Sequence, residues 1–146
     1  EKFDCGDILM QEAVTIDLNM TAGELRDRCS KFAQGMVGEL LNKIEKGEIT
    51  AQKQDDSRAS YESQIEFRDT IVDFKKSKLN IHNHIRALKP WYTPIFKDNT
   101  RHIEIKKHRL LALDDKYKNA KIGSIVFENS KTVLVRALDC LVEITK

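Results

Sequence analysis

Two carboxylates and a thiol stand close together near the start of the sequence, in the run Asp4-Cys5-Gly6-Asp7. Loop carboxylates can support acid–base chemistry. The same run is also ordinary turn chemistry, because Asp and Gly are common turn residues. The residue types alone favour a turn and leave a catalytic role for Asp4 open.

The remaining cysteines and histidines give no nucleophile or metal pattern. Cys29 and Cys140 have no nearby histidine that suggests a nucleophile. The absence of a C-x-x-C pair and the odd total of three cysteines argue against a zinc site or disulfide framework and favour a reducing compartment. His82 and His84 lie two residues apart on a predicted helix, so they point apart. We expect no metal site and surface positions for all four histidines.

Charge is unevenly distributed. Residues 1–67 carry 8 Lys or Arg and 14 Asp or Glu, whereas residues 68–118 carry 13 and 6. The basic block is typical of a surface that binds a polyanion such as nucleic acid, although a solvated lysine-rich face has the same composition. With 40% hydrophobic and 33% charged residues and no long apolar run, the chain has the composition of a soluble globular protein.

The first half is predicted to hold a strand, a long helix and a linker. The strand covers residues 8–17. The helix covers residues 21–46, between a Thr21/Glu24 capping box and a Lys46-Gly47 stop signal. Residues 48–66 lack periodicity and are typical of an interdomain linker. The helix carries one apolar stripe, predicted to be core: Leu25, Cys29, Phe32, Met36, Leu40 and Ile44.

The second half is predicted to be one helix followed by strands. Ser77 is expected to cap a helix over residues 78–88, and Pro90 prevents its continuation. Turn-like Asp and Asn residues then separate five strand-like runs: 93–97, 102–113, 123–128, 132–137 and 140–145. This order predicts a small β-barrel of the OB type and a mixed α+β fold class.

Four stretches, in order, resemble the methionyl-tRNA formyltransferase family. Residues 3–9 (FDCGDIL) are similar to the family's L-D-T-G-D-M/I-L active-site loop. Residues 54–61 (QDDSRASY) are similar to the Q-D-x-S-x-A-S/T-Y stretch between the two domains. Residues 72–74 (VDF) replace I-D-W, and residues 85–91 (IRALKPW) match I-R-A-x-x-P-W. The chain departs from this pattern at Cys5, in place of Thr, and at Phe74, in place of Trp.

The resemblance implies an organisation and a reaction. Residues 1–47 would be the end of a Rossmann-like formyltransferase domain, 48–66 the linker, and 67–146 an OB-like tRNA-binding domain. The implied reaction transfers a formyl group from 10-formyltetrahydrofolate to the α-amine of methionyl initiator tRNA. Asp4 matches the family's aspartate that orients a catalytic histidine, and Cys5, Gly6 and Asp7 would face the folate.

The resemblance also implies what the chain lacks and what it binds. The family's catalytic Asn and His and its S-L-L-P loop would precede Glu1, so the 146-residue chain alone is expected to be inactive. We expect a monomer without metal or membrane contact, in the bacterial cytoplasm or an organellar matrix. The implied tRNA-binding cations are Lys75, Lys76, Lys78, Arg86, Lys89, Arg101, Lys106, Lys107 and Arg109.

Two alternatives stay open. A nucleotide-sugar formyltransferase or a formyltetrahydrofolate hydrolase would share the D-x-G-D loop, but the basic block and the R-A-x-x-P-W run count against both. A non-enzymatic OB-type nucleic-acid-binding module would need exposed aromatic side chains for stacking. The second half offers six aromatic residues, most of which fall at predicted core positions: Phe74, Trp91, Tyr92, Phe96, Tyr117 and Phe127.

Overall fold

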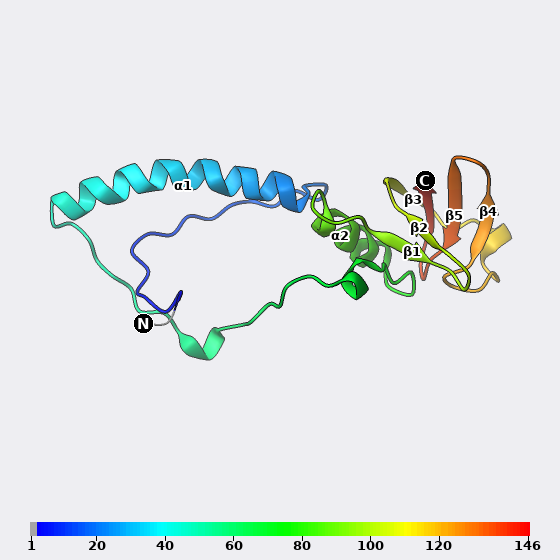
Figure 1. Ribbon diagram of the computed structural model, residues 1–146, viewed down its shortest axis with the longest axis horizontal. Coiled ribbons are helices and arrows are strands. Elements are labelled where there is room, and N and C mark those ends of the chain that lie inside the picture. The colour runs from blue at the N-terminus through cyan, green and yellow to red at the C-terminus, as the bar shows by residue number, and fades with distance from the viewer. Residues whose placement is uncertain (1–2) are drawn as a thin grey trace. The chain divides into compact units, whose positions relative to one another are not determined.

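The computed structural model describes residues 3–146 as two compact units (Figure 1). The first unit comprises the chain up to Met20 together with Glu24–Gln64. The second comprises Thr21–Gly23 together with Ile65–Lys146. The functional division at residues 47 and 66 stays a prediction.

The first unit contains one long helix, α1 (Ala22–Glu45), most of which belongs to it. Its bounds agree with the prediction to within a residue. At its end Gly47 adopts a φ of 69°, and the Gly47 and Glu48 amides donate to the carbonyls of Ile44 and Lys43. The Lys46-Gly47 stop signal therefore works as expected, because glycine enters the left-handed region without steric cost.

The apolar stripe of α1 is not a core, contrary to the prediction. Its six residues are half-buried or exposed; Phe32 is 40% and Ile44 50% exposed, and Cys29 is also exposed. Gly23 is the buried residue of this helix. The physical reason is that the described part of the first unit contains no second α-helix and no sheet that could cover the stripe.

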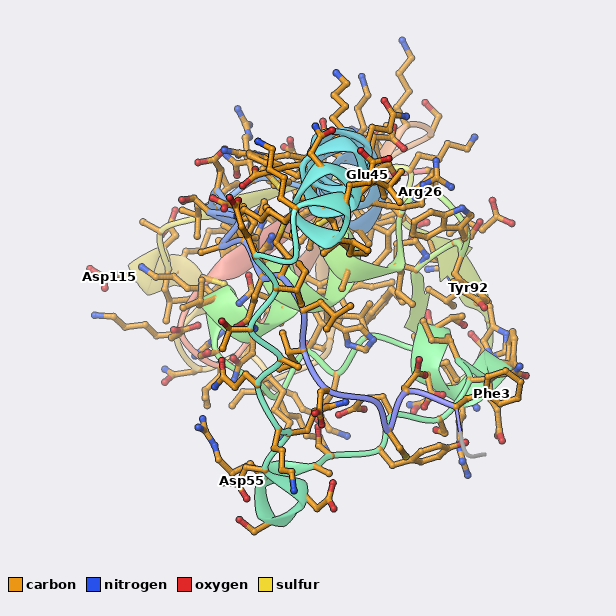
Figure 2. All side chains as sticks on the ribbon, turned by 90° about the vertical axis from the view of Figure 1, so that its left-hand side faces the viewer. Phe3, Arg26, Glu45, Asp55, Tyr92 and Asp115 are labelled. Atoms are coloured by element: carbon orange, nitrogen blue, oxygen red, sulfur yellow. The ribbon has the colours of Figure 1, made fainter. Side chains whose placement is uncertain are left out.

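The strand predicted over residues 8–17 is also wrong, apart from one antiparallel bridge. The Ile8 amide donates to the Gln52 carbonyl at 2.8 Å, and the Gln52 amide donates to the Ile8 carbonyl at 2.9 Å. A strand needs a partner along its length to satisfy its backbone groups. The linker supplies such a partner at residue 52 only, and then forms the 3-10 turn η1 (Asp56–Arg58), which Asp55 caps (Figure 2).

The second unit is a mixed α+β fold, which confirms the predicted fold class. Strand β1 pairs antiparallel with β2, and a second antiparallel sheet has the order β3-β6-β5-β4. Whether the sheets close into an OB-type barrel stays a prediction. The elements are η2 (Phe67–Thr70), α2 (Lys78–Leu88), β1 (Ile95–Lys97), β2 (His102–Glu104), β3 (Lys107–Leu111), η3 (Asp115–Tyr117), β4 (Ile125–Glu128), β5 (Thr132–Arg136) and β6 (Leu141–Thr145).

Among the described residues, six strands form where five were predicted, because the run 102–113 is divided between two sheets. The Ile105 amide donates to the carbonyl of Pro94, in the segment that leads into β1. The next amide, that of Lys106, donates to Thr145 of β6. The chain therefore changes partner between these two residues, which separates β2 from β3.

Helix α2 and both sheets share one hydrophobic core. Ser77 caps α2 as predicted, and Ile81, Ile85 and Leu88 are buried, whereas Leu79 is 50% exposed. Phe74 and Phe96 pack edge to face, with ring centroids 4.9 Å apart. Within the described residues, no helix is long and apolar enough to cross a membrane.

Candidate functional site

The Asp4–Asp7 run forms an exposed loop in the first unit. Asp4 has a φ of 59°, a left-handed conformation that Asp tolerates better than most residues. The Cys5 thiol donates to the Phe3 carbonyl at 3.3 Å. The structure thus gives the run the turn geometry that its composition favours and leaves Asp4 and Asp7 exposed to solvent.

A linker side chain contacts this loop, which the sequence-based reasoning missed. The Gln54 amide nitrogen lies 2.8 Å from the Asp4 carbonyl oxygen and 2.7 Å from that of Gly6. These residues are 50 and 48 positions apart in the chain. The sequence feature that could have indicated this contact is Gln54 itself, the first residue of the Q-D-D-S-R-A-S-Y stretch.

The predicted tRNA-binding cations fall into separate groups on the second unit. Lys75, Lys76 and Lys78 are exposed at the start of α2. Lys106 and Lys107 are exposed where the chain passes from β2 to β3. Arg109 lies farther along β3, with its guanidinium 3.3 Å from the Glu143 carboxylate.

Two predicted cations of the R-A-x-x-P-W run make contacts within the protein. Arg86 is half-buried, and its Nε donates to the Asn83 side chain at 2.9 Å. Lys89 donates from Nζ to the Lys106 carbonyl at 2.7 Å. Burial, followed by the nearby charge of Lys107, lowers the pKa of the Lys89 amine. Lys89 therefore joins the end of α2 to the segment between β2 and β3.

Arg101 belongs to an ion-pair network at the β1–β2 turn. Its guanidinium lies 3.0 Å from Asp98 and 2.6 Å from Glu128, and Lys146 lies 2.5 Å from the same Glu128. Hydrogen bonds from Arg101 and then from Lys146 lower the pKa of Glu128 to about 2. The pKa of Asp98 is lowered by the Thr100 amide first and by Arg101 next. A role for Arg101 in tRNA binding stays a prediction, and these bonds compete with it.

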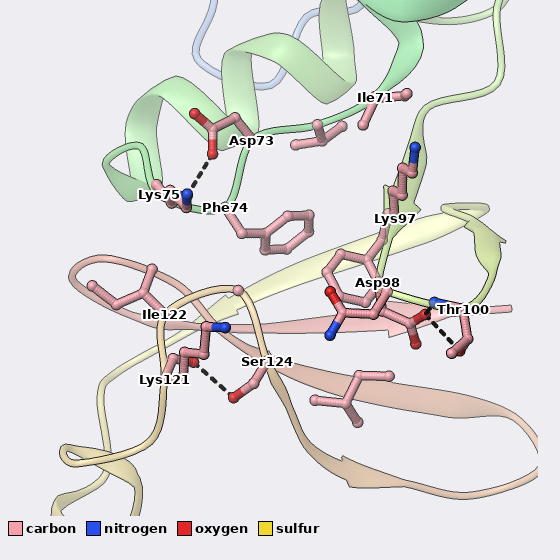
Figure 3. A pocket seen from close by; sticks show the side chains of 15 residues that line it. Ile71, Asp73, Phe74, Lys75, Lys97, Asp98, Thr100, Lys121, Ile122 and Ser124 are labelled. Atoms are coloured by element: carbon pink, nitrogen blue, oxygen red, sulfur yellow. Dashed lines mark hydrogen bonds between the residues drawn. The ribbon is translucent and has the colours of Figure 1, made fainter.

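A cavity of about 700 Å³ lies in the second unit (Figure 3). Three segments line it: residues 71–75, residues 96–100 and residues 121–125. Lys75, Lys97 and Lys121 belong to these segments together with Asp73 and Asp98. Lys97 lies within the basic block, whereas Lys121 lies outside it, and neither was among the predicted cations.

His82 and His108 contact each other, with Nδ1 of His82 2.9 Å from Nε2 of His108. Both are half-buried, as is His84, so these histidines are less exposed than predicted. Burial, followed by the charges of His82 and Lys89, lowers the pKa of His108 to about 4. His84 instead lies 2.7 Å from the Asp69 carbonyl, which confirms that His82 and His84 point apart. Within residues 3–146, no group of three or more His, Cys, Asp or Glu is placed to hold a metal ion.

The aromatic residues of the second unit are less buried than predicted. Phe74 and Phe96 are in the core, but Trp91 is 49%, Tyr92 38% and Phe127 50% exposed. These three positions lie near turns or strand ends, where the core does not reach them. Burial therefore does not exclude base stacking at these three positions.

Residues 64–146 match the family described as formyl transferase, C-terminal domain, which is more than half of the chain. The chain belongs to the formyltransferase family. The four motifs indicated a formyltransferase, and this match confirms it. Among the formyltransferase relatives, the methionyl-tRNA formyltransferase of Clostridium novyi (strain NT) is 34% identical over 132 residues, covering 90% of this chain and 42% of that protein.

A second relative and two solved structures support the same assignment. The methionyl-tRNA formyltransferase of Coxiella burnetii (strain RSA 331 / Henzerling II) is 39% identical over 95 residues, 65% of this chain and 30% of that protein. An N-formyltransferase from Helicobacter canadensis, solved with folinic acid and dTDP-3-aminofucose, is 25% identical with a TM-score of 0.67 and covers 98% of this chain and 51% of that one. The sugar 3N-formyl transferase WlaRD, solved with dTDP and 5-N-formyl-THF, is 27% identical with a TM-score of 0.64, covering 98% and 50%.

This formyltransferase chain spans less than half the length of the curated relatives it matches. The matched C-terminal domain covers α2 and both sheets, whereas the Asp4 loop lies outside it. The roles of Asp4, Cys5, Gly6 and Asp7, and of the basic side chains, therefore stay predictions.

Proposed function

We propose that this chain is part of a methionyl-tRNA formyltransferase, which transfers a formyl group from 10-formyltetrahydrofolate to the α-amine of methionyl initiator tRNA. The observation that carries the proposal is the relative of that name from Clostridium novyi. Its similarity extends over 132 residues, so it continues beyond the C-terminal domain matched at residues 64–146.

In this proposal the Asp4 loop supports the chemistry. The amine must attack the formyl carbon as a free base, and the tetrahedral oxyanion that forms needs hydrogen-bond donors. An aspartate beside a histidine orients the imidazole and favours its charged form. Asp4 takes this role, and its exposure leaves the carboxylate accessible to such a partner. Cys5, Gly6 and Asp7 face the folate, in keeping with the folate derivatives in the two solved relatives.

The second unit holds the tRNA in this proposal. Binding an acceptor arm requires neutralisation of phosphates by Lys and Arg, and each contact steepens the salt dependence. Lys106 and Lys107 are exposed on adjacent positions and are the principal candidates. We add three further candidates from the segments that line the cavity: Lys75, Lys97 and Lys121. A monomeric state and a bacterial cytoplasmic or organellar location stay predictions.

A nucleotide-sugar N-formyltransferase is the second candidate. It is favoured by the two solved structures, whose similarity covers 98% of this chain at 25% and 27% identity. The curated relatives at 34% and 39% identity favour the tRNA substrate instead. Both candidates share the formyl-folate and differ in the amine that accepts the formyl group.

The test compares amine substrates with the intact protein and 10-formyltetrahydrofolate. We expect a far higher kcat/KM for methionyl initiator tRNA than for dTDP-3-aminofucose. The reverse preference would replace the proposal with the second candidate. The 146-residue chain alone is expected to bind tRNA in a salt-dependent manner without transferring formyl groups. Measurable transfer by this chain would contradict the need for the family's Asn and His.

A further inference from the structure

A single side chain bridges the two carbonyls on either side of Cys5. Gln54 places its amide nitrogen 2.8 Å from the Asp4 oxygen and 2.7 Å from the Gly6 oxygen. Carbonyl oxygens only accept hydrogen bonds, so the NH2 group of the carboxamide, with its two hydrogens, must face them. The chemistry of the two partners therefore determines the orientation of the Gln54 side chain, since its oxygen could bond to neither.

Backbone hydrogen bonds next to this contact also join the loop to the linker. Two residues before Gln54, Gln52 exchanges two backbone hydrogen bonds with Ile8, at 2.8 and 2.9 Å. Four hydrogen bonds thus join residues 4–8 to residues 52–54. Two come from the Gln54 side chain and depend on its identity, whereas the two at Gln52 use backbone atoms and do not.

The bridged segment has a conformation that needs support. Asp4 is in the left-handed region with a φ of 59°, which costs free energy for any residue other than glycine. The loop is exposed, so it has no packed core to hold it. Hydrogen bonds to the carbonyls of Asp4 and Gly6 hold the Asp4–Cys5 and Gly6–Asp7 peptide planes. The Asp4–Cys5 plane is attached to the Asp4 Cα, so holding it constrains the direction in which the Asp4 carboxylate leaves the backbone.

We propose that Gln54 is a positioning residue, whose carboxamide holds the Asp4–Gly6 turn and thereby aims the Asp4 carboxylate; this rests on the proposed function. The linker is then more than a spacer between two units. It supplies a structural part of the active-site loop. The Q-D-D-S-R-A-S-Y stretch consequently has two roles. It connects the two units along the chain, and its Gln54 side chain binds the Asp4–Gly6 turn.

The test uses the intact protein with Gln54→Met and Gln54→Glu. Methionine keeps the length of the side chain without donors, and glutamate presents oxygens to the two carbonyls. We expect kcat to fall roughly 10- to 100-fold, because a small displacement of a catalytic group has an effect of this size. The KM for methionyl-tRNA and the melting temperature should stay at the values of the unsubstituted protein, since the tRNA-binding unit is untouched. Gln52→Ala is the matched control and should retain full activity, because the Ile8 contacts use its backbone.

Two further readouts separate positioning from a general loss of structure. A displaced Asp4 stabilises a charged histidine less, so the histidine-governed limb of the kcat pH profile should move to lower pH. Alkylation of Cys5 should become faster, since its thiol leaves the bond to Phe3, whereas alkylation of Cys29, which is exposed on α1, should not change.

The outcomes distinguish this inference from the proposed function. If the unsubstituted protein formylates an amino-sugar nucleotide instead of tRNA, the same kcat and alkylation comparisons are made with that substrate. Gln54 variants with unchanged kcat and unchanged Cys5 alkylation would overturn the positioning role. Equal losses of kcat, melting temperature and tRNA affinity would also overturn it, because they indicate a folding defect.

Discussion

At the scale of single residues, the His82–His108 contact joins helix α2 to strand β3. The two ring nitrogens that make this contact lie 2.9 Å apart. One ring must donate and the other accept, so the contact requires that at least one imidazole be neutral. The positive charge of Lys89 nearby also disfavours a charged His108. Burial is the largest cause, and together these effects lower the pKa of His108 to about 4.

This pKa predicts a loss of stability in mild acid. Between the ordinary histidine pKa of about 6.5 and the folded value of about 4, the unfolded chain binds a proton at His108 that the folded chain does not. The free energy of unfolding should therefore fall as the pH falls through this window. Urea unfolding at pH 7 and pH 5 measures the change. The lowered pKa of Glu128 acts mainly below that group's ordinary value of 4.5, so its contribution between these two pH values is small.

His108→Gln removes the titrating group and should flatten the dependence between pH 7 and pH 5. His84→Gln is the matched control, because His84 lies on the same helix as His82 but contacts the Asp69 carbonyl. It should retain the dependence of the unsubstituted chain. A His108→Gln chain that loses as much stability as the unsubstituted chain would show that another group is responsible.

At the scale of elements, the start of α1 and the end of α2 approach each other within the second unit. The Gly23 amide donates to the Lys89 carbonyl at 3.1 Å. A Cβ at Gly23 would lie 2.5 Å from Cδ and 3.2 Å from Cγ of Pro90. The glycine is therefore required by space rather than by its backbone angles, and it allows the contact between these two helix ends.

Gly23→Ala should destabilise the second unit by about 1–3 kcal/mol, the usual range for overpacking a close contact. Thermal unfolding followed by circular dichroism measures the effect. Gly35→Ala is the control in the same helix, because no neighbouring atom lies within 4 Å of that position. It should stabilise α1 by roughly 0.5–1 kcal/mol, since alanine is the better helix former. A Gly23→Ala chain as stable as the Gly35→Ala chain would contradict the close approach.

At the scale of the whole molecule, acidic and basic residues are separated along the chain. The excess of carboxylates in residues 1–67 falls mostly in the first unit, and the cations of residues 68–118 fall in the second. In the described structure these cations also differ in whether their side chains are free of contacts within the protein. Lys106 and Lys107 are exposed, whereas Arg101 is held by two carboxylates and Lys89 by a backbone carbonyl.

Lys106→Glu/Lys107→Glu should weaken binding of the chain to initiator tRNA and reduce the slope of log affinity against log salt by about 2, roughly one for each phosphate that is no longer neutralised. A salt titration measures both. Lys31→Glu/Lys43→Glu makes the same charge change on α1, outside the basic block, and should have a much smaller effect. Equal effects of the two double variants would show that only net charge matters.

Local signals in the sequence determined the helices and turns. Ser77 and the bounds of α2 were predicted correctly, because a cap acts on amides within three residues. The turns at Asp98 and Asn129 were also predicted, since each side chain accepts from amides two and three residues ahead. The order of the four motifs indicated the family, and the role of Asp4 beside a histidine was implied by that resemblance alone.

Only the tertiary structure decided which distant residues meet. Gln54 is 50 residues from Asp4, and His82 is 26 residues from His108, so no local pattern records either contact. The break at residues 105–106 follows from two hydrogen-bonding partners in different sheets. The apolar stripe of α1 was visible in the sequence, but periodicity marks a face without showing what covers it. Burial and long-range pairing depend on the whole arrangement of the chain, whereas capping and turn formation depend on a few neighbouring residues.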